Sequence, residues 1–319
     1  MKKILIIGAG AMGSAFTIPC IDNKNSVTIT EPYNKLFIKN LSLKRKFHPS
    51  LKINLPSKVK FKKYSTNLLN NKYDLVVVAL SLSGINFISN EFLKSKIKCP
   101  ILILTKGLKY EKKLNKVFTI SEQIKKNNRN LNISVLKGPC LAKELANKKQ
   151  TSVVVANKNT KKAKEICKLI STKYYLTETS KDIIGVEICS AIKNIYSMII
   201  GAGDSLNMSS SLFKKSINEM IHITKYFQGS AETTLGLAGV GDLYVSAAGG
   251  RNSKMGSYLG KGYTFKQAKK KFMPHDTVEG EQLAREIAPF VLKKFQQKKI
   301  PLMIKLIKSL IYNKKLVLN

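Results

Sequence analysis

The sequence predicts two domains, an amino-terminal α/β domain built on a doubly wound sheet and a mostly helical carboxy-terminal domain. Short runs of valine, isoleucine and leucine alternate with helix-like stretches up to about residue 180, and beyond that point apolar residues recur with the helical period. A chain of 319 residues is long enough for two domains of ordinary size. We place the domains at residues 1–181 and 182–319.

Continuous apolar runs are typical of strands that are covered on both faces of a parallel sheet. Six such runs precede the boundary: Lys3–Ile7, Ser26–Thr30, Leu75–Leu80, Ile101–Thr105, Ile133–Leu136 and Ser152–Ala156. Because strands here alternate with helices, we expect a Rossmann-type domain. From Ile183 onward the periodicity predicts helices, interrupted by glycine clusters at 236–241 and 249–250.

The chain is strongly basic, with 56 lysines and arginines against 19 acids and a formal charge of +37. Such a charge suits nucleic-acid binding, so a nucleic-acid-binding protein that keeps a nucleotide fold is the non-enzyme alternative. However, only four of the basic residues are arginine, and the lysines are spread along the whole chain. We interpret them as solvated faces and expect no specific nucleic-acid partner.

Neither cysteine nor histidine spacing indicates a metal site or a disulfide framework. The five cysteines are scattered without a C-x-x-C pair, and the three histidines lie far apart. The first apolar run ends at Gly8, which is too short for a signal peptide, and no run approaches the roughly 20 apolar residues of a membrane-spanning helix. We therefore expect a cytoplasmic protein.

A glycine-rich loop, Gly8-Ala9-Gly10-Ala11-Met12-Gly13, follows the first predicted strand and opens a helix. In a dinucleotide-binding loop, Gly8 would permit the tight turn and Gly10 would let the backbone approach a pyrophosphate. Gly13 would allow close packing of helix on strand, and the helix amino terminus would offer free N–H donors. A glycine-rich turn without a ligand is the alternative.

Glu31 ends the second predicted strand, 18 residues after Gly13. An acid at this place accepts hydrogen bonds from ribose hydroxyls and repels a 2′-phosphate, which favours NAD over NADP. Lys35 and Lys39 follow at one and two helical turns and could serve a phosphate, so NADP stays possible.

The predicted helix 185–200 carries a polar stripe on an otherwise apolar surface, formed by Glu187, Ser190, Asn194 and Ser197. Lys193 borders this stripe. If the helix is buried, the low dielectric favours the neutral amine, as proton transfer near neutral pH requires. A surface lysine reaching out from a core helix is the alternative.

A second polar cluster follows in the glycine-rich segment that contains Asp242 and Arg251. Asp242 is an isolated acid that could hold a lysine by charge and hydrogen bonding. Arg251 and Asn252 could form a donor cluster for a phosphate or carboxylate. A structural loop with a helix cap is the alternative.

These motifs, in this order along nearly the whole chain, resemble the NAD(P)-dependent glycerol-3-phosphate dehydrogenase family. The matching blocks are the glycine loop, Thr105-Lys106-Gly107, Gly138-Pro139 with Ala142-Lys143-Glu144, Ile192-Lys193-Asn194, Leu237–Leu243, Gly250-Arg251-Asn252 and Val278-Glu279-Gly280. The resemblance implies hydride transfer between NAD(P)H and dihydroxyacetone phosphate, giving sn-glycerol 3-phosphate for phospholipid synthesis. It also implies a homodimer.

The resemblance also implies roles for individual residues. Lys193 matches the catalytic proton donor and acceptor, with Asp242 beside it, and Lys106 matches a lysine that contacts both substrate and cofactor. The remaining implied substrate contacts are Gly138, Cys140, Asn194, Ser246, Gly250, Arg251 and Asn252. The implied cofactor contacts are Gly8, Gly10, Ala11, Met12, Gly13, Glu31, Ala142, Arg251, Thr277 and Glu279.

The sequence departs from the family pattern at several places, with Ser246 where threonine is usual and Gly250 where many members have serine, and two further departures motivate an alternative substrate. Cys140 stands where serine or threonine is usual, and residues 201–215 lack the family's glycine-rich segment. A related two-domain dehydrogenase acting on another small anionic 2-keto or 2-hydroxy compound is therefore the alternative within enzymes.

Overall fold

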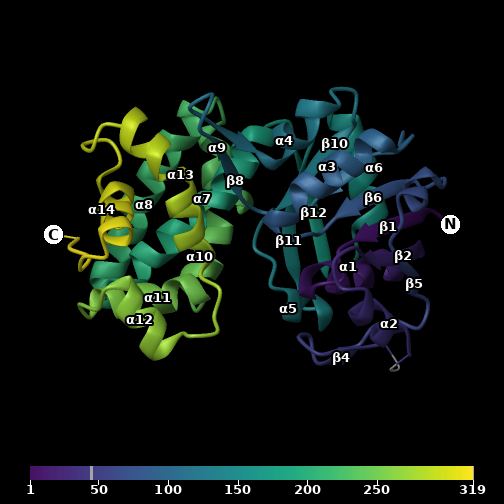
Figure 1. Ribbon diagram of the computed structural model, residues 1–319, viewed down its shortest axis with the longest axis horizontal. Coiled ribbons are helices and arrows are strands. Elements are labelled where there is room, and N and C mark those ends of the chain that lie inside the picture. The colour runs from purple at the N-terminus through teal and green to yellow at the C-terminus, as the bar shows by residue number, and fades with distance from the viewer. Residues whose placement is uncertain (44–45, 319) are drawn as a thin grey trace. The chain divides into compact units, whose positions relative to one another are not determined.

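The structure is a computed structural model that describes residues 1–43 and 46–318 (Figure 1). By its internal contacts the chain forms two compact units, one of Met1–Lys106 with Ile120–Ile183 and one of Gly107–Thr119 with Ile184–Asn319. The sequence analysis assigned 107–119 to the first domain, whereas the contacts group this segment with the helical unit. The domain boundary at residues 181/182 stays a prediction.

The first unit is built on one large sheet flanked by helices. Its strands are β1 (Lys3–Ile7), β2 (Ser26–Glu31), β3 (Phe47–His48), β4 (Ile53–Asn54), β5 (Lys60–Lys63), β6 (Leu75–Val78), β7 (Ile101–Ile103), β10 (Ile133–Lys137), β11 (Thr151–Ala156) and β12 (Tyr175–Ser180). Its helices are α1 (Ala11–Asp22), α2 (Lys35–Leu43), α3 (Ile85–Lys94), α4 (Ile120–Asn127), α5 (Ala142–Ala146) and α6 (Thr160–Ile170), with short 3-10 turns η1 (Thr66–Asn70) and η2 (Leu82–Gly84).

Eight of these strands form the sheet in the order β12-β11-β10-β7-β6-β1-β2-β5, while β3 and β4 pair as a separate hairpin. All neighbouring pairs in the large sheet are parallel except β10 with β11. Each of the six predicted runs contains a strand, which confirms the α/β, Rossmann-type prediction. The sequence analysis did not predict β5, because its K-F-K-K sequence lies at the edge of the sheet and lacks a continuous apolar run.

The strand β1 is buried because helices cover the side chains that it directs to one face. Ile4 and Ile6 share a buried cluster with Val27 and Ile29 of β2 and with Phe16 of α1. The approach of α1 to β1 is close: a Cβ on Gly13 would lie 2.0 Å from the carbonyl oxygen of Gly8. Only glycine therefore fits at position 13, as the sequence analysis expected.

The second unit consists of helices and one hairpin, which confirms the helical prediction. Its elements are β8 (Leu108–Glu111), β9 (Lys116–Thr119), α7 (Ile183–Gly201), α8 (Leu206–Tyr226), α9 (Ala231–Leu235), the π-helical turn η3 (Leu237–Gly241), α10 (Asp242–Ala247), α11 (Arg251–Gly260), α12 (Phe265–Phe272), α13 (Glu279–Lys294) and α14 (Pro301–Tyr312).

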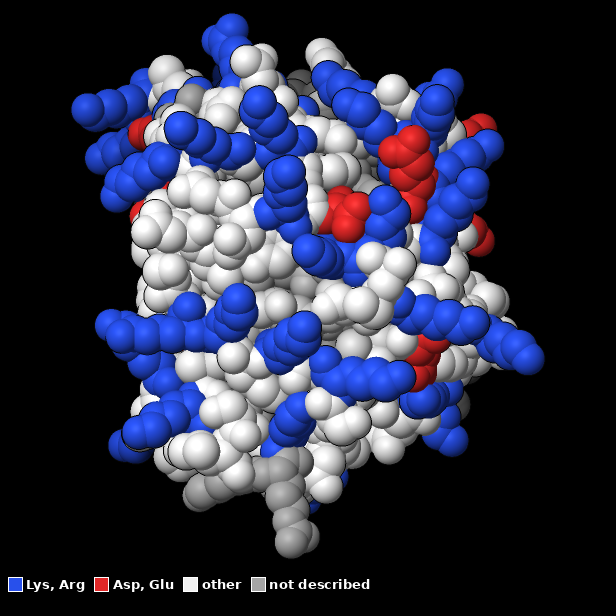
Figure 2. Space-filling model, turned by 90° about the vertical axis from the view of Figure 1, so that its right-hand side faces the viewer, with Lys and Arg blue, Asp and Glu red and all other residues white. Residues whose placement is uncertain are grey.

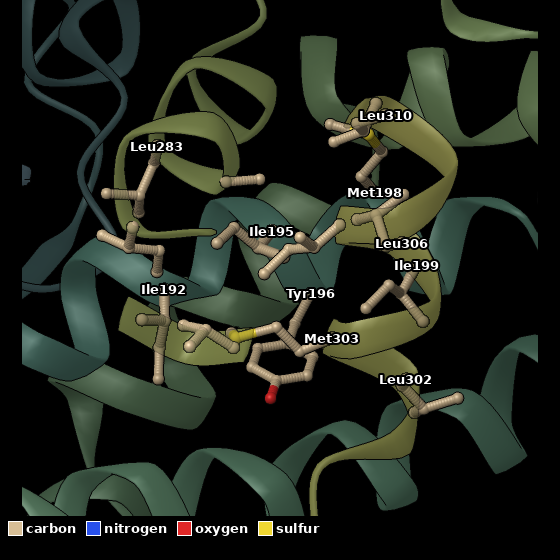
Figure 3. Packing of buried hydrophobic residues seen from close by; sticks show 14 of the residues in the cluster. Ile192, Ile195, Tyr196, Met198, Ile199, Leu283, Leu302, Met303, Leu306 and Leu310 are labelled. Carbon is tan, nitrogen blue, oxygen red and sulfur yellow. The ribbon is translucent and has the colours of Figure 1, made fainter. Parts of the chain in front are cut away.

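The centre of this unit is α7, whose apolar side chains pack against α13 and α14 (Figure 3). The sequence analysis expected no segment long and apolar enough for a membrane span, whereas the length and composition of α7 would allow one. However, 94% of its most apolar stretch is buried inside the protein. It is therefore the core helix of a soluble unit, and the apolar run is explained by packing.

The hairpin β8–β9 belongs to the helical unit because its apolar side chains have their contacts there. Leu108 and Val117 are buried in the same cluster as α7. The backbone N–H of Tyr110 donates to Glu286 of α13 at 2.9 Å, and the Lys109 ammonium lies 3.0 Å from the same carboxylate.

Basic side chains are spread over the face of the molecule that Figure 2 shows, in line with the distribution of lysines along the sequence. Figure 2 shows one face of the molecule, on which lysines and arginines are scattered with a few acids between them, with no single basic stripe. The arrangement is that of a solvated, lysine-rich face.

Candidate active site

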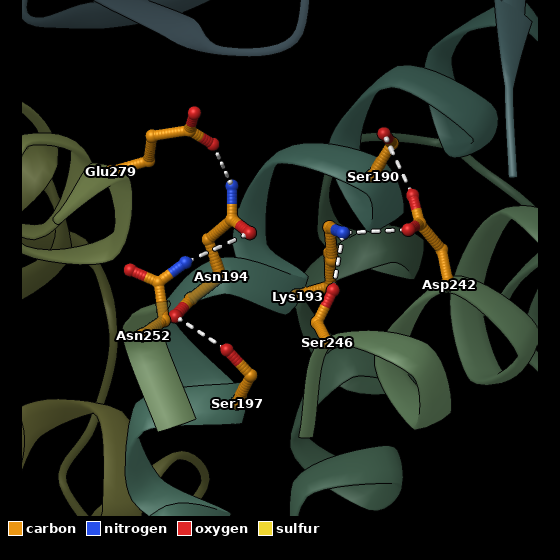
Figure 4. A network of polar contacts seen from close by, with 8 residues as sticks. All are labelled: Ser190, Lys193, Asn194, Ser197, Asp242, Ser246, Asn252 and Glu279. Carbon is orange, nitrogen blue, oxygen red and sulfur yellow. Dashed lines mark hydrogen bonds and ion pairs between the residues drawn. The ribbon is translucent and has the colours of Figure 1, made fainter. Parts of the chain in front are cut away.

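A buried lysine–aspartate pair forms the centre of a polar network in the helical unit (Figure 4). Lys193 and Asp242 are only 7% and 2% exposed, and the Lys193 Nζ lies 2.6 Å from the Asp242 Oδ1. The same ammonium donates to the hydroxyl of Ser246. The Ser190 hydroxyl donates to Asp242 Oδ2 at 3.5 Å, so both carboxylate oxygens are engaged.

Local structure explains why these groups meet. Lys193 and Ser190 are one turn apart on α7, where the polar stripe interrupts a helix that is apolar elsewhere. Asp242 is the first residue of α10, directly after the π-helical turn, and Ser246 follows one turn later on the same face. Burying two charges is costly unless they are paired and hydrogen-bonded, and here they are both.

A second chain of polar contacts extends from Asn194 to the start of α13 (Figure 4). The Asn194 amide donates to Glu279 at 3.2 Å and accepts from the Asn252 amide at 3.1 Å. Asn252 in turn accepts from the Gly280 N–H at 2.8 Å. The Arg251 guanidinium is 53% exposed and lies 3.4 Å from Glu279, so an arginine and a carboxylate share the exposed end of this network.

In the first unit, the glycine loop has the shape of a dinucleotide-binding turn. Gly8 has φ of +111°, and a Cβ there would lie 2.5 Å from the carbonyl oxygen of Ala79. A Cβ on Gly10, in contrast, would meet nothing within 4 Å. The first turn of α1 has no side-chain cap, so its N–H groups are available to a ligand. The open space at Gly10 and the uncapped helix fit a pyrophosphate.

Glu31 is tied to this loop by two backbone amides. Its Oε2 accepts from the N–H of Ala9 at 2.9 Å and its Oε1 accepts from the N–H of Tyr33 at 3.0 Å. A carboxylate has further lone pairs, so both oxygens can still accept from ribose hydroxyls.

Other predicted residues of this unit lie at the same edge of the sheet. Lys106 and Gly138 each follow the carboxyl end of a strand, and those strands, β7 and β10, are parallel neighbours. Cys140 is half-buried and Ala142 is the first residue of α5. Ligands of doubly wound sheets bind outside the carboxyl ends of the strands, so these positions agree with a cofactor edge.

Two predicted residues of the helical unit lie at element boundaries. Gly250 is the N-cap of α11, directly before Arg251. Thr277 is exposed in the segment that precedes α13. Among the residues that the structure describes, no group of three His, Cys, Asp or Glu side chains is placed to hold a metal ion.

The sequence analysis missed one buried charge at the cofactor edge. Lys137, the last residue of β10, is 2% exposed, and its ammonium donates to the carbonyls of Ile103, Leu104 and Thr105, the residues that precede Lys106. The available signal was a lysine that ends an otherwise apolar strand run.

Family models match both units of the chain. The description "NAD-dependent glycerol-3-phosphate dehydrogenase N-terminus" matches residues 3–163, and the corresponding C-terminus matches residues 182–318. The chain belongs to the NAD-dependent glycerol-3-phosphate dehydrogenase family. The resemblance stated from the motifs is thereby confirmed, and the chain is an NAD(P)-dependent oxidoreductase.

Individual relatives agree with this family assignment. An NADP(+)-dependent glycerol-3-phosphate dehydrogenase from Archaeoglobus fulgidus is 32% identical, with 83% of this chain and 82% of the relative covered. A glycerol-3-phosphate dehydrogenase [NAD(P)+] from Bacillus pumilus is 30% identical, with 85% and 80% covered. The crystal structure of a glycerol-3-phosphate dehydrogenase from Coxiella burnetii shares the fold, with a TM-score of 0.85, 22% identity, and 98% and 96% covered.

Proposed function

We propose that this dehydrogenase interconverts dihydroxyacetone phosphate and sn-glycerol 3-phosphate, with Lys193 as the proton donor and acceptor. The observation that carries the proposal is the buried contact of Lys193 with Asp242 and Ser246. A lysine held rigidly in a site with little water is suited to transfer a proton to a substrate oxygen. The relatives are named for their action on glycerol 3-phosphate.

In the reduction, the C2 carbonyl oxygen gains negative charge as a hydride adds to C2. The reduced nicotinamide supplies the hydride, since no protein side chain can do so. The Lys193 ammonium donates an N–H to the oxygen as its charge grows, and the proton then moves to the oxygen to form the hydroxyl. In the oxidation, the neutral amine takes the proton back from the C2 hydroxyl. A preorganised donor of this kind stabilises the transition state more than the ground state.

Asp242 acts through Lys193 in this scheme and is a positioning residue. Its carboxylate fixes the direction of the ammonium at 2.6 Å and balances the buried charge. The Ser190 hydroxyl donates a hydrogen bond to Asp242, and the Ser246 hydroxyl accepts one from Lys193. Each rotamer is thereby fixed before the substrate arrives, which lowers the entropy cost of reaching the reacting geometry.

The phosphate of the substrate requires cationic and amide donors, which Arg251, Asn194 and Asn252 would supply. Arg251 is half-exposed and presents a planar guanidinium that matches phosphate oxygens. The two asparagines hold each other through an amide–amide hydrogen bond at 3.1 Å, which fixes the side-chain planes. Binding energy gained at the phosphate would orient the ketone at the other end.

Additional contacts follow from the family pattern. Lys106 would direct a second cation at the carbonyl oxygen, and Gly138, Cys140, Ser246 and Gly250 would line the substrate. Ala142, Thr277 and Glu279, with Ala11 and Met12 of the loop, would contact the cofactor. Glu31 favours NAD over NADP, because its negatively charged carboxylate would repel the 2′-phosphate of NADP. We further propose that the enzyme is cytoplasmic and forms a homodimer. Light scattering on the purified protein would test the dimer.

A steady-state assay that crosses NADH and NADPH with a panel of ketones tests the proposed function. We expect NADH oxidation with dihydroxyacetone phosphate, faster than with pyruvate or another 2-keto acid that lacks a phosphate. A clear preference for a non-phosphorylated acid would favour the alternative dehydrogenase that Cys140 motivates. No turnover with either cofactor at millimolar ketone would reject the proposal.

A further inference from the structure

We infer that His48 is a positioning residue for the dinucleotide loop: its imidazole fixes the carbonyl of Ala9 and so aims the N–H of Gly10 toward the cofactor. The inference rests on the proposed cofactor site, and it adds a residue from outside the glycine motif. His48 lies in the hairpin β3–β4, 39 residues along the chain from Ala9.

The imidazole is enclosed and oriented. His48 is 1% exposed, and its Nε2 lies 3.2 Å from the carbonyl oxygen of Ala9. The ring of Phe37, from α2, packs edge-on against it, with ring centroids 5.5 Å apart and an interplanar angle of 86°. An aromatic edge contact of this kind restricts rotation of the imidazole.

The hydrogen bonds assign the tautomer. The backbone N–H of Leu51 donates to the Nδ1 of His48 at 3.3 Å, so Nδ1 carries no proton. A neutral imidazole then carries its proton on Nε2, which donates to the Ala9 carbonyl. Burial lowers the pKa of His48, which agrees with a neutral ring at physiological pH.

The backbone of Ala9 is held at both its N–H and its carbonyl group. The Ala9 N–H donates to Glu31 at 2.9 Å, and the Ala9 carbonyl accepts from the Ser14 hydroxyl at 2.9 Å as well as from His48. In a planar trans peptide the carbonyl and the next N–H point in opposite directions. Since the Ala9 oxygen is turned toward His48, the Gly10 N–H points away from His48. Separately, a Cβ on Gly10 would meet nothing within 4 Å, so a ligand has room to approach this residue.

Two substitutions separate this hydrogen bond from the general packing of the ring. In His48→Asn, the side-chain oxygen takes the place of Nδ1 and can still accept from Leu51, but the side chain is too short to reach Ala9. In His48→Gln, the side-chain amide takes the place of Nε2 and can donate to Ala9. Loss of one neutral hydrogen bond corresponds to roughly 3- to 10-fold in a dissociation constant.

The test measures NADH binding to the whole enzyme in the absence of substrate. The fluorescence of bound NADH reports the binding. We expect His48→Asn to raise the Kd for NADH about 3- to 10-fold and His48→Gln to stay within about twofold of the wild type. At saturating NADH, kcat and the KM for dihydroxyacetone phosphate should be unchanged in both. Thermal unfolding of each variant reports any general loss of stability.

Leu51→Ala is the matched control, because it weakens the packing of the same hairpin but keeps the His48 imidazole and the backbone N–H that donates to it. Equal Kd values for His48→Asn and His48→Gln would overturn the inference, and so would an equal rise in Leu51→Ala. Failure of the wild type to bind NADH would instead reject the proposed cofactor site itself.

Discussion

The Lys193 Nζ and the Asp242 Oδ1 lie 2.6 Å apart although 49 residues separate them in the sequence. One side chain comes from the central helix of its unit and the other from the first residue of a short helix after a π-helical turn. The proposed proton transfer needs an ammonium that is shielded from solvent, paired with a carboxylate and held in one direction, and the Lys193 ammonium meets these conditions.

Replacing Lys193 by methionine should remove the proton donor while keeping most of the side-chain volume. We expect kcat for dihydroxyacetone phosphate to fall about 10³-fold, because both acid catalysis and charge stabilisation are lost. The Kd for NADH should stay within about twofold of the wild type, since the glycine loop is untouched. Lys215→Met, at an exposed position of α8, is the control and should retain full activity. Near-normal turnover of the Lys193→Met variant would show that Lys193 is not the proton donor.

Arg251→Ala should act on substrate capture. Loss of a charge-assisted contact to phosphate predicts a rise in the KM for dihydroxyacetone phosphate of about 10- to 100-fold, with a smaller change in kcat. Initial rates over a range of substrate concentrations measure both constants. Arg129→Ala makes the same chemical change at an exposed turn and should leave KM as it is. An unchanged KM in Arg251→Ala would refute the phosphate assignment.

Glu31→Gln should shift the choice of cofactor. The variant keeps an oxygen acceptor but removes the charge that opposes a 2′-phosphate, so we expect the ratio of the Kd for NADPH to that for NADH to fall about 10-fold. Titration of both cofactors by fluorescence gives the ratio directly. Glu165→Gln, on the exposed surface of α6, should not alter it. The same ratio in wild type and Glu31→Gln would mean that other residues select the cofactor.

Glu219 of α8 should make stability depend on pH. Burial raises the pKa of this carboxyl above the ordinary 4.5, although the amides of Leu302 and Met303 and the hydroxyl of Tyr196 oppose the rise. The folded protein therefore holds the proton more tightly than the unfolded chain. This contribution to stability is present below pH 4.5 and is lost as the pH rises through the raised pKa.

The comparison with Glu219→Gln isolates this effect. Urea unfolding from pH 4.5 to 7.5 should show the largest advantage of the wild type over the variant at the acidic end, and a smaller one at pH 7.5. A difference in the free energy of unfolding that stays constant across the range would contradict the assignment.

Local patterns were enough to predict much of this molecule. The runs at Lys3–Ile7 and Ser26–Thr30 predicted strands that the structure contains, and the glycine spacing predicted the turn between β1 and α1. The stripe along α7 indicated a buried polar edge. These features repeat within a few residues, so the side-chain periodicity of one element reveals which face is covered.

The sequence by itself therefore determined the class of each domain, and it was enough to propose the cofactor loop and the lysine on which the proposed chemistry depends. Only the tertiary structure decided that the expected pair of Asp242 and this lysine is buried and in contact, that the 107–119 hairpin packs with the helical unit, and that His48 reaches the glycine loop. Each of these depends on contacts between residues far apart in the chain. Such contacts follow from the complementary packing of whole elements and leave no short-range periodicity in the sequence.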